Sequence, residues 1–226
     1  MIVTIHQPDF APWLGFFDRW QKSDLFIVLD DVQFLRRGWH HRDRVKTAAG
    51  PRWLTVPVKK KGRFVQRINE TEIDNAIDWR TKHLDTIAAA YGKTPGFRTV
   101  FPLLARTYGE RHTLLVEFNL ALLALFAGLL GIGTPVAFAS AHPSTSRAGE
   151  RLAELTEIHG GKVYHTGTGS RSYLNENIFA ARGIAVLWQE FDHPHYPQPH
   201  GDFAAGMSVI DFLMCQSPAN AKGCHA

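Results

Sequence analysis

The chain has 226 residues, of which 45% are hydrophobic and 20% charged, and its formal net charge is +4 with twelve histidines counted as neutral. This composition is ordinary for a globular protein and excludes a disordered or low-complexity chain. The length suits one large domain, and no linker divides the sequence. We therefore expect a single α/β domain over residues 1–226, with a helical lobe at about 76–131.

The N-terminus, the longest apolar run and the cysteines indicate where in the cell the protein is expected. The first five residues have neither the basic nor the apolar region of a signal peptide. The apolar run at 120–130 is shorter than the roughly 20 residues of a membrane span, so we expect a buried helix and no membrane insertion. Two cysteines, Cys215 and Cys224, are too few for a disulfide framework, and the spacing of Cys215 favours core packing. We therefore predict a reducing, cytoplasmic location.

The first predicted elements form a βαβ unit. Residues 2–5 read as a short buried strand that stops at Gln7-Pro8. Residues 12–20 begin with proline and place aromatic residues at steps of three and four, which predicts an amphipathic helix. Residues 25–29 form a second apolar strand that ends in Asp30-Asp31. Two buried strands joined by a helix predict a parallel pair with a right-handed crossover.

The rest of the chain continues the alternation. After a loop that carries Arg42, Arg44 and Lys46, residues 53–58 read as a strand at an edge or bulge, and Ile68 and Ile73 favour a β excursion. Further helices are predicted at 76–91, 113–130, 146–159 (with Ser146 as N-cap) and 171–181, and strands at 135–138, 162–165 and 184–188. Gly183 fits the end of a helix, and Ser208 the N-cap of a last one. The pattern predicts an α/β fold with a mostly parallel, doubly wound, Rossmann-like or nucleotidylyltransferase-like sheet and a helical lobe.

Polar residues follow several predicted strands, where ligands of open α/β sheets bind. His6 follows the first strand, and a histidine can act as a general acid or base near neutral pH. The rigid Gln7-Pro8 turn would set the direction of its imidazole, although a histidine that merely caps a loop is the alternative. Asp30 and Asp31 could orient that base or hold Mg²⁺, with a turn carboxylate as the alternative for one of them.

Other segments suggest anion binding. Basic residues crowd the segment 36–63, where Arg42, Arg44 and Lys46 could clamp phosphate or carboxylate oxygens. The turn from Gly167 to Ser170 could cradle an anion, or be an ordinary tight turn. The charge suits a small anionic substrate, and it would also suit RNA.

A histidine-rich segment near the C-terminus raises the question of a metal. Prolines around His193 and His195 hold the chain extended and would direct both rings to one side. No thiolate or HExxH helix accompanies them, so we rank substrate binding first and assign no metal site.

Several motifs occur in the order of a known family. They are His6-Gln7-Pro8, Pro12-Trp13-Leu14-Gly15, Leu29-Asp30-Asp31-Val32-Gln33-Phe34, Leu54-Thr55-Val56-Pro57-Val58, Tyr173-Leu174, Tyr196-Pro197-Gln198 and Ser208-Val209-Ile210-Asp211. The chain resembles the WbqC-like proteins of bacterial polysaccharide gene clusters over nearly its whole length. It departs from their pattern at His41-Arg42-Asp43, where the family tends to have Asn-Arg-Asn. A looser likeness to pantothenate-synthetase-type adenylating enzymes rests on Arg171-Ser172-Tyr173-Leu174 and is fold-level analogy.

The family resemblance implies an enzyme that decorates amino sugars, and it completes the candidate site. The candidate catalytic residues are His6, Asp30 and Asp31. The candidate substrate-binding residues are Gln7, Trp13, Gln33, Arg42, Arg44, Lys46, Gly167, Ser170, Arg171, Tyr173, His193, Tyr196 and Gln198.

Three hypotheses follow. The leading one is a transferase or ligase that forms an amide on the amine of a nucleotide-linked amino sugar or similar small amine, in polysaccharide or specialised-metabolite biosynthesis. The second is an ATP-dependent adenylating or nucleotidyl-transfer enzyme. The third is a non-catalytic carbohydrate- or nucleic-acid-binding module, which the six tryptophans and the basic segment permit. The donor stays open among acyl-CoA, aminoacyl-tRNA, a carrier, and ATP with Mg²⁺, and so does the oligomeric state.

Overall fold

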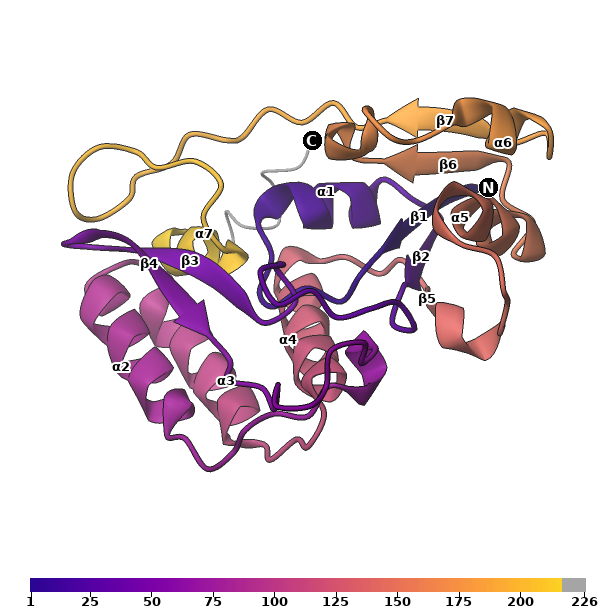
Figure 1. The fold of residues 1–226 in the computed structure, drawn as a ribbon. Coiled ribbons are helices and arrows are strands. Elements are labelled where there is room, and N and C mark those ends of the chain that lie inside the picture. Colours follow the sequence, from indigo (N-terminus) through magenta and orange to yellow (C-terminus); the bar gives the residue numbers. More distant parts are fainter. Residues whose placement is uncertain (217–226) are drawn as a thin grey trace. The chain divides into compact units, whose positions relative to one another are not determined.

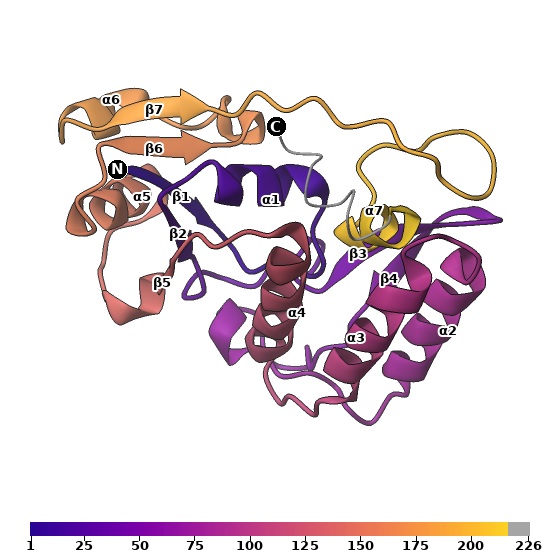
Figure 2. The ribbon, with the colours of Figure 1, turned by 180° about the vertical axis from the view of Figure 1, so that it is seen from behind.

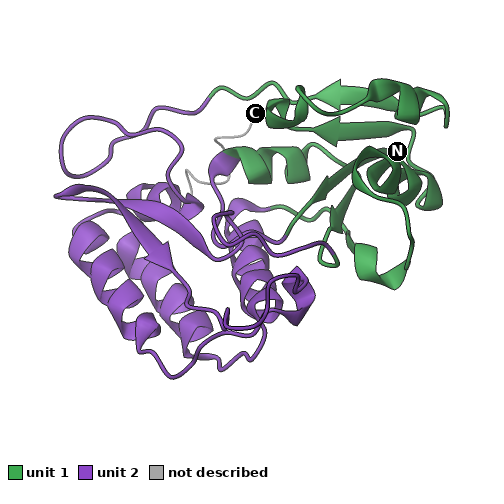
Figure 3. Cartoon of the chain, viewed as in Figure 1, with its two compact units in different colours: residues 1–7, 15–31, 132–192 green, residues 8–14, 32–131, 193–226 purple. Residues whose placement is uncertain are grey.

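The computed structural model describes residues 1–216. The chain divides into two compact units, each built from three separate segments of the sequence (Figure 3). Unit 1 combines residues 1–7, 15–31 and 132–192, and unit 2 combines residues 8–14, 32–131 and the described residues from 193 onward. The expectation of a single domain with a helical lobe stays a prediction.

Unit 1 is built on a five-stranded sheet (Figures 1 and 2). Its strands, in spatial order, are β5 (Val136–Phe138), β2 (Leu25–Val28), β1 (Ile2–His6), β6 (Val163–Thr166) and β7 (Ala185–Trp188). All neighbouring strands are parallel. The order runs outward from β1 in one direction and from β6 in the other, so it reverses between these two strands. This confirms the predicted βαβ unit and the doubly wound, Rossmann-like sheet.

Helices cover both faces of this sheet, as a parallel sheet requires. On one face, α1 (Leu14–Gln21) packs Phe16 and Trp20 against Phe26 of β2, with ring centroids 5.5 and 4.4 Å apart. On the other face, α5 (Ala148–Ile158) and α6 (Glu176–Ala180) share a buried core with β1, β2 and β6. The apolar strands predicted from continuous hydrophobic runs are therefore buried on both sides.

Unit 2 contains most of the helical structure. Its helices are α2 (Trp79–Tyr91), α3 (Phe97–Gly109), α4 (Leu115–Leu130) and α7 (Val209–Cys215), beside an antiparallel hairpin of β3 (Arg42–Thr47) and β4 (Gly50–Thr55). The apolar run at 120–130 lies in α4, where Leu122 and Phe126 are fully buried, as predicted. Within residues 1–216, no helix combines the length and apolarity of a membrane span.

The largest correction concerns the hairpin. Arg42, Arg44 and Lys46 were predicted in a loop, and the structure places them on β3. The strand is hidden in the sequence because its buried positions include a carboxylate, Asp43, so the alternation of apolar and polar residues is broken. The strand predicted at 53–58 ends at Thr55.

Helix boundaries needed several corrections. The helix α3 was missed because Pro102 lies inside it and reads as a helix breaker. The helix predicted at 171–181 begins only at Glu176, after a 3-10 turn, η3 (Thr168–Ser170), and an N-cap at Asn175. The N-cap of α5 is Arg147 rather than Ser146.

Other local predictions are confirmed or partly so. Ser208 caps α7 by accepting a hydrogen bond from the Ile210 amide, Gly183 has a φ of +66°, and Cys215 is buried. Cys224 lies outside the described residues. In the predicted β excursion, Ile68 lies in a 3-10 helix, η1 (Ile68–Glu70). Isolated β-bridges are made by its neighbours: Arg67 with Gln33, Glu72 with Leu114 and Ile73 with Val58.

Candidate active site in unit 1

A pocket of about 300 Å³ opens at the carboxyl ends of β1 and β6, where the strand order of unit 1 reverses. This is the position at which open α/β sheets bind their ligands, because the neighbouring crossovers leave in opposite directions. The lining residues come from both strands and their ends, from the residue after β2, from α1 and α5, and from the turn after β6. They are Ile5, His6, Gln7, Arg19, Leu29, Leu152, Tyr164, Thr166, Gly167, Gly169, Ser170 and Tyr173.

His6 is the titratable group at the end of β1 on this pocket wall. Its ring packs edge-on against Phe16 at 4.8 Å, and its Nδ1 lies 3.0 Å from the carbonyl oxygen of Gln7. When Nδ1 donates this hydrogen bond, Nε2 is the basic nitrogen. The Gln7 carbonyl therefore favours the tautomer that leaves Nε2 unprotonated.

Arg19 places a buried guanidinium on the pocket wall, and sequence reasoning missed it. Its Nη1 donates a hydrogen bond of 3.1 Å to the Gln189 side chain, which itself donates to the Asp18 carboxylate and the Gly15 carbonyl, each at 2.8 Å. The available signal was a charged pair, Asp18 and Arg19, inside an otherwise aromatic helix. A charge on a buried helix face needs partners, and such a site is a functional candidate.

The turn after β6 makes room for that guanidinium. A Cβ added to Gly167 would lie 2.2 Å from Arg19 Nη1, so only glycine lets the two groups approach. Ser170 Oγ donates to the Gly167 carbonyl at 2.9 Å and lies 3.1 Å from Thr166 Oγ1. The backbone N–H groups of Ser170 and Arg171 donate within the turn, and the Ser170 side chain lies in the pocket lining. The anion-binding role of this turn stays a prediction.

The two predicted carboxylates do not belong to the pocket lining. Both oxygens of Asp30 accept hydrogen bonds from Ser140, at 3.0 Å from its amide and 2.7 Å from its hydroxyl. Asp31 forms an ion pair of 3.0 Å with Arg151 of α5. These partners do not fit a magnesium site, and no cluster of three or more metal-binding side chains occurs within residues 1–216. The catalytic role of Asp30 and Asp31 stays a prediction.

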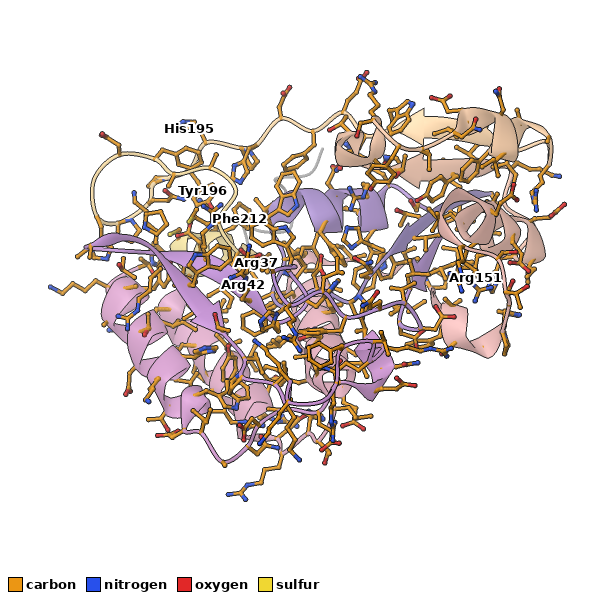
Figure 4. The ribbon with its side chains drawn as sticks, in the orientation of Figure 1. Arg37, Arg42, Arg151, His195, Tyr196 and Phe212 are labelled. Carbon is orange, nitrogen blue, oxygen red and sulfur yellow. The ribbon has the colours of Figure 1, made fainter. Side chains whose placement is uncertain are left out.

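In unit 2, two of the predicted binding residues, Tyr196 and Gln198, belong to a buried network. The Asp211 carboxylate accepts hydrogen bonds from Tyr91 at 2.6 Å, Tyr196 at 2.8 Å and Gln198 at 2.7 Å. Tyr196 also packs on Phe212, with ring centroids 5.1 Å apart (Figure 4). Burial raises the pKa values of both Asp211 and Tyr196. These groups satisfy each other and hold the fold.

The remaining predicted residues lie as follows. Lys46 is buried, and its ammonium donates to the carbonyls of Gly201 and Asp202. Arg42 and Arg44 lie against the indole of Trp53 on the hairpin. Trp13 forms a β-bridge with Ser208, and the Gln33 side chain donates a hydrogen bond to the Phe64 carbonyl. The His193 ring contacts the ring of Phe203, and the Arg171 guanidinium lies over the Trp188 ring. The structure thus groups His6, Gln7, Gly167, Ser170 and Tyr173 in one pocket and leaves Arg171 outside its lining.

A second buried polar cluster in unit 2 was not predicted. His40 Nδ1 lies 3.0 Å from the Asp9 carboxylate, and Nε2 of the same ring is buried without a hydrogen-bond partner among the described residues. Burial lowers the pKa of the adjacent His41 to about 4 and raises that of Asp43 to about 8. In both cases burial favours the neutral form of the side chain. The paired histidines in the sequence were the signal for this cluster.

Comparisons with known proteins agree with the motifs described above. The model of the WbqC-like protein family matches residues 7–222. A Mycobacterium tuberculosis protein named "Uncharacterized protein Rv1507c" is 37% identical over 213 residues, which cover 93% of this chain and 92% of that relative. No solved structure matches the chain significantly. The chain therefore belongs to the WbqC-like protein family.

Proposed function

We propose that the protein is an enzyme that forms an amide, by moving an acyl or aminoacyl group to the amine of a nucleotide-linked amino sugar or a similar small amine. The observation that carries the proposal is the pocket at the switch point of unit 1. An imidazole, a guanidinium and several hydroxyls border it together. These groups match the amine, the anionic carrier and the hydroxyls of such a substrate.

His6 is the acid–base catalyst in this proposal. Its imidazole accepts a proton from the substrate amine as the nitrogen attacks the donor carbonyl carbon. The new C–N bond forms while the bond between the acyl carbon and the donor's sulfur or oxygen breaks, and the imidazolium returns the proton to the leaving group. Proton transfer of this kind contributes roughly 10²- to 10⁴-fold to a rate.

Arg19 and the turn after β6 bind the substrate. The guanidinium pairs with an anionic group, and the hydroxyls of Ser170 and Tyr173 bond to the sugar. A volume of about 300 Å³ lies at the low end of ligand pockets, which span about 300–1,000 Å³. The pocket therefore fits one sugar ring, with the nucleotide extending beyond it. The compartment in this proposal is the cytoplasm, as the cysteine usage predicts.

The test is mass spectrometry of reactions with the purified full-length chain. Candidate nucleotide-linked amino sugars are supplied with acyl-CoA, with aminoacyl-tRNA, or with ATP and amino acids. We expect an amide product with one donor class, a loss of at least about 100-fold in turnover for His6→Asn, and normal turnover for the matched variant His195→Ala. An unchanged rate for folded His6→Asn would refute the assigned base, and no amide from any pairing would refute the reaction.

Adenylation or nucleotidyl transfer is the second candidate. It is favoured by the doubly wound strand order with a pocket at its switch point, which suits a nucleotide as well as a sugar. This reading predicts release of pyrophosphate from ATP in the presence of the acceptor. An amide formed from acyl-CoA without ATP would decide against it.

A further inference from the structure

In unit 2, the β3–β4 hairpin and the segment before it expose two indoles beside two arginines. Trp39 and Trp53 are 48% and 43% exposed, with ring centroids 5.5 Å apart. The Arg44 guanidinium lies 5.9 Å from the first ring and 5.5 Å from the second, and that of Arg42 lies 4.6 Å from Trp53. We call Trp39, Arg42, Arg44 and Trp53 the Trp–Arg platform.

The strand register and one backbone contact hold the platform in place. Arg44 pairs directly with Trp53 across the hairpin, so both side chains lie on the same face. Arg42 donates a hydrogen bond of 2.9 Å to the carbonyl of Arg37, and Figure 4 shows these two residues close together. Apolar side chains that are exposed next to one another mark interaction sites more often than singly exposed ones do.

Three other basic side chains of the same segment have partners of their own. Lys59 and Arg63 each pair with Glu72 at 2.7 Å, and Lys46 is buried against backbone carbonyls. The carboxylate within β3, Asp43, lies on the opposite face of the strand. Positive charge is therefore concentrated beside the exposed indoles.

We propose that the Trp–Arg platform binds single-stranded nucleic acid. Bases stack on Trp39 and Trp53, and Arg42 and Arg44 contact phosphates, as in other sequence-tolerant single-strand sites. A neutral glycan would use the indoles but not the arginines, whereas an acidic peptide would use the arginines but not two flat rings. The inference goes beyond the proposed function and does not depend on it, because that function concerns the pocket of unit 1.

The test is fluorescence anisotropy of a labelled single strand of about ten nucleotides, as RNA and as DNA, with the full-length chain. We expect Trp39→Ala and Trp53→Ala each to weaken binding about tenfold. The double variant Arg42→Gln/Arg44→Gln should also reduce the slope of log affinity against log salt by about 1.4, because it removes two phosphate contacts. Arg98→Gln, which changes an exposed arginine on α3, is the matched control and should bind normally.

Further arms keep the result decisive. Trp53→Leu tests the same contact if Trp53→Ala is unstable, because leucine keeps an apolar side chain at this position but has no flat ring. We expect Trp53→Leu to weaken binding as much as the alanine substitution. Tighter binding of either single strand than of the corresponding duplex supports the proposal. Equal binding of single strand, duplex and heparin would overturn it in favour of a general polyanion surface. Salt-independent binding of a neutral oligosaccharide, with none of the oligonucleotide, would overturn it in favour of a carbohydrate site.

Discussion

The pocket of unit 1 and the Asp211 network of unit 2 use polar side chains in opposite ways. In unit 2, the Asp211 carboxylate is fully buried and accepts hydrogen bonds from Tyr91, Tyr196 and Gln198. In unit 1, His6 and Arg19 border a pocket of about 300 Å³. Polar groups that satisfy one another stabilise a fold, whereas polar groups that border a cavity can bind a ligand. The same residue types in a sequence therefore say little about function until their partners are known.

The largest expected effect concerns the network of unit 2. Asp211→Ala leaves two buried phenols and an amide without their acceptor, so we expect a loss of about 3 kcal/mol or more in the free energy of unfolding. Chemical denaturation followed by circular dichroism measures it. The exposed-site control Asp202→Ala should change stability by less than about 0.5 kcal/mol, and His6→Ala by less than about 1 kcal/mol. If Asp211→Ala and the parent protein had the same denaturation curve, the Asp211 network would not stabilise the fold as proposed.

The second prediction concerns pH. Burial raises the pKa of Asp43 from 3.8 to about 8, so the folded protein holds a proton that the unfolded chain loses. Stability should then fall by up to about 1.4 kcal/mol per pH unit as the pH rises through this window. Burial lowers the pKa values of His41 and His83 from 6.5 to about 4, which acts in the opposite direction below pH 6.5. Above pH 6.5 the effect of Asp43 stands alone among these three groups.

Asp43→Asn should therefore flatten the decline of stability between pH 6.5 and 8. The measurement is the free energy of unfolding at several pH values. Asp85→Asn, an exposed change on α2, is the control and should leave the decline as it is. A decline that persists in Asp43→Asn would show that another group causes it.

The third prediction sharpens the role of the pocket in unit 1. Gly167→Ala would bring a methyl group against the Arg19 guanidinium, which can swing away because it is the end of a flexible side chain. We expect about tenfold weaker binding of a UDP-linked amino sugar by calorimetry, with little change in stability. Gly128→Ala on α4 is the matched control, because no atom lies within 4 Å of the added Cβ and Gly128 does not line the pocket. Equal affinities for the two variants would remove Arg19 from the proposed site.

The smallest expected effect belongs to Arg171. Its guanidinium lies 5.3 Å from the Trp188 ring, outside the pocket lining. Arg171→Met should reduce stability by about 0.5 kcal/mol and change ligand affinity by less than twofold. A tenfold loss of affinity in the same calorimetric assay would show that Arg171 contacts the ligand after all.

The fold was predictable where hydrophobic patterns were continuous. The strands β1 and β2 and the helices α1 and α4 follow directly from apolar runs and their spacing. The hairpin was not predictable, because Asp43 occupies a buried position that the pattern expects to be apolar. The helix α3 was hidden by Pro102, since the packing of that helix tolerates a residue that local propensity forbids.

By itself, the sequence determined the family, the parallel sheet of unit 1 and the position of His6 at the end of its first strand. These depend on local periodicity and on motifs that are continuous along the chain. Only the tertiary structure decided that Arg19 and Gly167 approach each other, and that Tyr196 and Gln198 bond to Asp211. Such partners are distant in sequence, and hydrogen bonding of buried groups leaves no periodic pattern from which they could be read.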